Sequence, residues 1–201
     1  MDERVLLDPR TSRDDIDDAM VRHDWQLVDI VSPTEARPEQ LVYAMSDGRS
    51  WLRLVDDARL GVAYVQATGP DSAAALAQVR EALVTITPDR LWQQLKAQEP
   101  DARCQGLCWL AATGMSAPDA SAVACVREAL CADDPAVREA ALMATSYLGW
   151  AELEQVLGER AEAEPVASLR RVVRALLDAW RARSSKPEPG VPGSAPKGPD
   201  S

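Results

Sequence analysis

The chain has 201 residues, of which 46% are hydrophobic and 27% charged, so it can build one good hydrophobic core or two small ones. Its net charge is −10, with 16 acidic against 9 basic residues in positions 1–87, which argues against nucleic-acid binding because that requires clustered Lys and Arg. No segment approaches the roughly 18 apolar residues that span a bilayer, and the first residues lack signal-peptide features, so we expect a cytoplasmic, membrane-free protein with reduced cysteines.

The first 87 residues have the pattern of a small α/β domain. Ser12 and Asp15 resemble a capping box and predict a helix over 12–23. The predicted elements that follow are strands at 25–31, 41–45, 51–55 and 60–68 and a helix at 72–85. Asp47-Gly48 supplies the tight turn between the second and third strands. The order predicts an α+β domain in which a four-stranded antiparallel meander has helices on one face.

Residues 88–183 are predicted to be entirely helical. Thr87 suits an N-cap and Pro88 the first helical position, while Gly114 and Gly149 suit left-handed C-caps. The predicted helices span 88–97, 100–113, 118–131, 134–148, 150–163 and 165–183. Residues 184–201 contain five prolines and three glycines, so we expect a disordered tail.

A repeated segment lies within this helical half, because residues 100–114 return 35 positions later as residues 135–149. The aligned pairs are Arg103 with Arg138, Leu107 with Leu142, and Gly114 with Gly149. Self-similarity at a fixed period is typical of helical solenoids, which mostly present a surface to another molecule.

The repeat resembles a HEAT-type repeat. That family's pattern is an acidic turn, a proline, a Val-Arg pair, small residues and a closing Leu-Gly, and residues 133–149 carry all of these. The resemblance covers roughly 88–183, with a weaker third copy from Pro165, and the spacing is closest to short bacterial HEAT-like repeats such as those of phycobilin lyases. It implies a stack of helix pairs, with Arg103 and Arg138 bonded to acidic or carbonyl groups of the adjoining repeat.

The residues that often carry chemistry form no recognisable site. Cys104 and Cys108 share a helix face, but Cys125 and Cys131 point about 240° apart, so four thiolates cannot surround a metal ion. His23, the only histidine, has no motif partner, and no nucleophile elbow, phosphate loop or dinucleotide fingerprint occurs. The one basic run, in the terminal helix, lies beside 14 acids in the same array. We therefore expect neither catalysis nor a cofactor.

Two groups of residues are candidates for binding a partner. The first is the acidic cluster that opens the first helix: Asp14, Asp15, Asp17 and Asp18. Acids there complement the helix dipole, and a solvated face is the simpler interpretation, but they also suit a basic partner. The second is Trp109 and Trp150, because tryptophan is enriched at binding hot spots; packing in the core of a short array is the favoured alternative.

These features predict a non-catalytic adaptor that binds a protein, with an unspecified oligomeric state. A more specific hypothesis is an immunity protein that masks a basic toxin. The alternatives are a chaperone or assembly factor with several weak clients, and a HEAT-like lyase that acts on a tetrapyrrole and would change its absorption spectrum.

Overall fold

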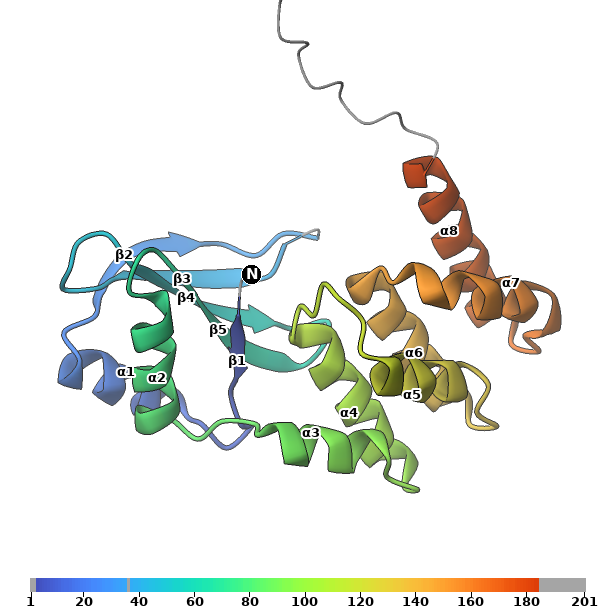
Figure 1. Ribbon diagram of the computed structural model, residues 1–201, viewed down its shortest axis with the longest axis horizontal. Coiled ribbons are helices and arrows are strands. Elements are labelled where there is room, and N and C mark those ends of the chain that lie inside the picture. The colour runs from blue at the N-terminus through green and yellow to red at the C-terminus, as the bar shows by residue number, and fades with distance from the viewer. Residues whose placement is uncertain (1–2, 36, 185–201) are drawn as a thin grey trace, which may run out of the picture.

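A computed structural model describes residues 3–35 and 37–184, so almost all of the predicted tail, 184–201, lies outside the described residues. The N-terminal half is an antiparallel sheet with two helices, and the C-terminal half consists of helices packed in pairs (Figure 1). This confirms the predicted fold class. Among the described residues, no helix is both long enough and apolar enough to cross a bilayer.

The sheet has five strands in the order β1-β5-β4-β3-β2, and every neighbouring pair is antiparallel. The strands are β1 Arg4–Leu6, β2 Gln26–Val31, β3 Glu39–Ala44, β4 Trp51–Asp57 and β5 Val62–Thr68. The four-stranded meander is as predicted, but β1 was missed. Only three residues long, β1 offers no alternation to recognise, and it becomes a strand by pairing with β5 about sixty residues later.

Two helices, α1 Arg13–Arg22 and α2 Ser72–Ala82, cover one face of the sheet (Figure 1). The predicted capping box at the start of α1 is confirmed, because the Ser12 side chain accepts from the Asp15 N–H while the Asp15 carboxylate accepts from the Ser12 N–H. Between the helices and the sheet lies a core of buried side chains that includes Leu52, Leu76 and Val79.

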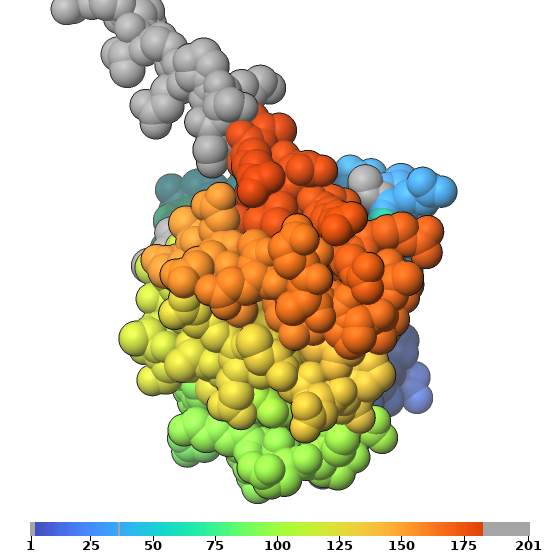
Figure 2. Space-filling view, turned by 90° about the vertical axis from the view of Figure 1, so that its right-hand side faces the viewer, coloured from blue at the N-terminus to red at the C-terminus, as the bar shows by residue number. Residues whose placement is uncertain are grey.

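The helical half is built from helix pairs that pack against one another. Its helices are α3 Pro88–Leu95, α4 Pro100–Ala112, α5 Ala120–Leu130, α6 Pro135–Leu148, α7 Glu154–Ala163 and α8 Ala167–Ser184, with a 3-10 turn at Ala151–Leu153. The two copies of the repeated segment, α4 and α6, pack side by side. Figure 2 shows the pairs as successive layers, from the green residues of α3 and α4 to the orange residues of α7 and α8.

The two halves share a hydrophobic core. On the sheet face opposite α1 and α2, Leu6, Val62 and Tyr64 join one buried cluster with side chains of α4 such as Leu107 and Leu110. The sequence predicted helices on one face of the sheet. The structure has helices on both faces, because α4 packs against β1 and β5 on the second face. Arg4 of β1 donates to the carbonyl oxygen of Ala112 at 3.1 Å, which ties the sheet to the end of α4.

Candidate functional site

The acidic cluster lies on the solvent-exposed surface of α1. The Asp15 carboxylate forms part of the capping box, and the hydrogen bonds that it accepts from the Ser12 side chain and backbone lower its pKa. Asp17 forms an ion pair with Arg13 at 3.3 Å. Asp14 and Asp18 are exposed and form no ion pair with another described residue. The structure thus brings the four predicted residues together, but only Asp14 and Asp18 are unengaged.

Arg138 links neighbouring helix pairs. Its guanidinium donates to both carboxylate oxygens of Glu164 at 3.0 and 2.9 Å, and to the carbonyl oxygens of Ala132 and Asp133 at 2.8 and 2.7 Å. Glu164 is only 1% exposed. Arg138 therefore connects the turn before its own helix with the segment that joins α7 to α8.

Arg103 occupies the same place in the first copy of the repeat. It donates to Glu128 of α5 at 2.9 Å, so it also bonds to an acidic group of the next helix pair. Glu128 is largely exposed, however, and exposed ion pairs contribute little to stability. The two aligned arginines thus both bond to a glutamate, but Glu128 is exposed and Glu164 is buried.

The structure places both candidate tryptophans in the core. Trp109 is 1% exposed, and the guanidinium of Arg90 lies 5.2 Å from the centre of its ring. Trp150 is 3% exposed, and its indole N–H donates to the carbonyl oxygen of Met115 at 3.0 Å. Neither side chain offers a partner an appreciable surface, so both take the packing role favoured for them.

Three of the four cysteines and the histidine are partly buried, whereas Cys131 is exposed. Burial raises the pKa of the thiols of Cys104, Cys108 and Cys125, which makes them weak nucleophiles at neutral pH. The ring of His23 stacks on that of Trp25 with centroids 5.1 Å apart. Within residues 3–35 and 37–184, no group of His, Cys, Asp and Glu is arranged to hold a metal ion.

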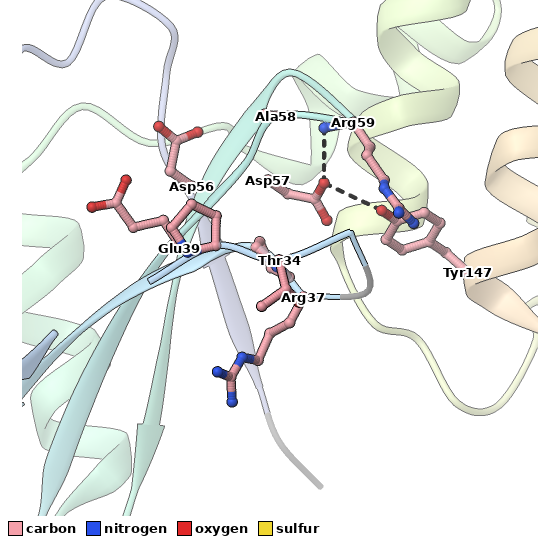
Figure 3. A pocket seen from close by; sticks show the side chains of 10 residues that line it. Thr34, Arg37, Glu39, Asp56, Asp57, Ala58, Arg59 and Tyr147 are labelled. Atoms are coloured by element: carbon pink, nitrogen blue, oxygen red, sulfur yellow. Dashed lines mark hydrogen bonds between the residues drawn. The ribbon is translucent and has the colours of Figure 1, made fainter. Parts of the chain in front are cut away.

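A pocket of about 160 Å³ lies where the two halves meet (Figure 3). Its wall is formed by the loop before β3, the turn between β4 and β5, and Tyr147 near the end of α6. Asp57 accepts hydrogen bonds from the backbone N–H groups of Arg59 and Leu60 and from the Tyr147 hydroxyl at 3.2 Å. Burial and the neighbouring Asp57 carboxylate raise the pKa of Tyr147 to about 12. The phenol is therefore neutral at physiological pH, and this group joins the halves rather than acting as a base.

Sequence reasoning predicted strand β2 but missed its exposure, which leaves three apolar side chains close together on the surface. Leu27, Val28 and Ile30 are 48%, 55% and 57% exposed. The apolar run predicted the strand, but whether a strand lies at the edge of a sheet depends on pairing between distant segments. No local signal could have shown it.

Comparison with known proteins gives no match to a protein-family model, to a curated protein or to a solved structure. The function of the chain is therefore argued from its own surfaces.

Proposed function

We propose that this protein is a non-catalytic interaction module that binds a basic protein partner. The observation that carries the proposal is the acidic surface of α1, where Asp14 and Asp18 are exposed and unpaired among the described residues. Helix capping does not account for Asp14 and Asp18, because Asp15 already forms the cap.

Charge distribution supports the same conclusion. The chain carries −10 at neutral pH, and acids outnumber bases 16 to 9 in residues 1–87, where α1 lies. A surface of one sign steers an oppositely charged protein and raises its association rate. An immunity protein that neutralises a basic toxin is the specific form of this proposal, and a HEAT-like stack would serve as its rigid support.

The experiment is affinity purification of the tagged full-length chain from its native cells at low salt, followed by mass spectrometry. We expect one near-stoichiometric partner with a basic isoelectric point. An acidic partner, a set of substoichiometric clients or an empty eluate would each count against the proposal.

The purified partner then tests the surface. Replacing Asp14→Asn and Asp18→Asn together should weaken binding by about three- to tenfold at low salt, mainly through slower association, and the difference should shrink as salt is added. The control removes two exposed acids far along the chain, Glu152→Gln and Glu162→Gln, and should leave the affinity unchanged. Equal weakening by both pairs would mean that only net charge matters.

A further inference from the structure

Strand β2 is an open edge of the sheet. It pairs with β3 on one side, and no described strand pairs with its other side (Figure 1). Five of its six residues are exposed and the sixth is half-buried. The edge therefore presents backbone N–H and C=O groups that another extended chain can pair with.

The residues of β2 do little to prevent such pairing. Natural edge strands are protected by charged residues, above all lysine, by proline, by β-bulges or by a covering element, and β2 has neither lysine nor proline. Its only charged residue is Asp29, and its only irregularity is a register shift between Leu27 and Asp29. The exposed side chains of Leu27, Val28 and Ile30 add apolar surface that a paired strand could bury.

The two faces of β2 differ in chemistry. Leu27 lies opposite Tyr43 and Ile30 opposite Leu41, so both point to the face of the sheet that α1 and α2 cover. Asp29 lies opposite Val42 and points to the other face. An added strand would therefore place apolar side chains beside Leu27 and Ile30 and, at alternate positions, a basic side chain beside Asp29.

A second copy of this chain fits the edge poorly. Pairing the whole of β2 with its own copy in antiparallel fashion puts Val28 of each copy opposite Asp29 of the other, so each carboxylate would lie beside an apolar side chain instead of a cation. Two chains of charge −10 also repel each other at long range. Along the chain, exposed acids and bases flank the strand in equal number, with Arg22 and Asp24 before it and Glu35 and Arg37 after it. The preference for a cationic occupant therefore comes from Asp29 on the strand and from the net charge of the chain.

We propose that β2 is the docking strand of the protein, and that it accepts an extended segment of the partner in which apolar and basic residues alternate. Backbone hydrogen bonds would supply affinity, and the alternation would supply specificity. This inference rests on the proposed function, because it names the segment of a basic partner that the acidic surface attracts.

The test uses the full-length, ¹⁵N-labelled chain and a capped synthetic peptide of about ten residues in which lysine and valine alternate. One control peptide replaces valine with serine and keeps the charge, and another replaces lysine with glutamate and keeps the apolar residues. We expect the Lys-Val peptide to bind about tenfold more tightly than either control and to slow amide exchange within residues 26–31. Binding that leaves exchange in β2 unchanged would overturn the proposal.

A pair of variants provides the matched control. Ile30→Lys and Val172→Lys add the same charge at residues that are 57% and 45% exposed, the first on β2 and the second on α8. Ile30→Lys should weaken binding of the Lys-Val peptide by about tenfold, and Val172→Lys should leave it unchanged. Equal affinities of the two variants would overturn docking on β2.

The same data separate this inference from the proposed function. The Lys-Val and Lys-Ser peptides could bind equally, with their binding weakened only by the double replacement Asp14→Asn and Asp18→Asn. That result would support binding to the acidic surface and overturn strand addition at β2. If the Glu-Val peptide binds best, both ideas fail. If sedimentation shows a dimer of the free protein that Ile30→Lys dissociates, a second copy occupies the edge and the proposal is overturned.

Discussion

Among single residues, Glu164 combines a charge with nearly complete burial. Its carboxylate accepts hydrogen bonds from the guanidinium groups of Arg138 and Arg160 and from the backbone N–H of Val166. Burial alone would raise the pKa of Glu164, but these donors outweigh it and hold the pKa at about 2. The ionised form is thus the one that the fold requires.

Replacing Glu164→Gln should lower the free energy of unfolding by about 3 kcal/mol at pH 7, because it leaves the buried guanidinium of Arg138 without its counter-charge. Urea unfolding measures the loss. The matched substitution Glu162→Gln, at an exposed position two residues earlier, should change stability by less than about 0.5 kcal/mol. A similarly small effect of Glu164→Gln would show that the pair contributes no net stability.

The stabilising effect of Glu164 should also depend on pH. Since its pKa in the folded protein lies below the ordinary value of 4.5, its ionised form stabilises the fold fully above about pH 4.5. That contribution is lost as the pH falls from 4.5 toward 2. The difference in unfolding free energy between the wild type and Glu164→Gln should therefore shrink across this interval, measured by urea titrations at successive pH values. A constant difference would contradict a lowered pKa.

At the scale of whole helices, α3 and α4 approach each other closely at Gly106. A Cβ atom built on Gly106 of α4 would lie 2.6 Å from the backbone nitrogen of Leu95 and 2.8 Å from the carbonyl carbon of Gln94. Because these are backbone atoms, they cannot move aside as the end of a side chain can. The absence of a side chain at position 106 thus sets the distance between the two helices.

Gly106 and Gly158 give a matched pair of substitutions within helices. Gly106→Ala should destabilise the protein by about 1–3 kcal/mol, since overpacking of the α3–α4 contact exceeds the gain in helix propensity. Gly158→Ala, in α7, meets no atom within 4 Å and should stabilise by up to about 1 kcal/mol. Thermal and urea unfolding test both, and a stabilising Gly106→Ala would show that the helices can separate at little cost.

Helices were predictable from the sequence to within a few residues because their ends are encoded locally. Asp134 caps α6 through its own side chain, and Gly149 ends it in a left-handed conformation. Contacts between distant segments were not predictable. The hydrogen bond from Tyr147 to Asp57 joins residues 90 positions apart, and the exposure of β2 depends on the order of all five strands. The acidic residues of α1 can be read from the sequence, whereas the open edge at β2 cannot.

For the molecule as a whole, the shared core indicates that the sheet and the helices stabilise each other. The cluster that holds Leu107 and Leu142 of the helical half also contains Leu6 and Tyr64 of the sheet. Polar contacts reinforce it, because buried Asp8 forms an ion pair with Arg90 at the start of α3. Each half would expose apolar surface if the other were removed.

Leu6→Ala therefore tests whether the chain unfolds as one unit. Truncating this buried side chain should destabilise the protein by about 2–5 kcal/mol. If the halves are coupled, amide exchange should accelerate in α4 and α6 as well as in β1 and β5, measured by hydrogen–deuterium exchange at neutral pH. The control is Leu76→Ala, which truncates a leucine in the separate core between α2 and the sheet. Faster exchange in the strands with unchanged exchange in α6 would instead show two units that unfold independently, and the helical stack would then be stable without the sheet that supports its first pair.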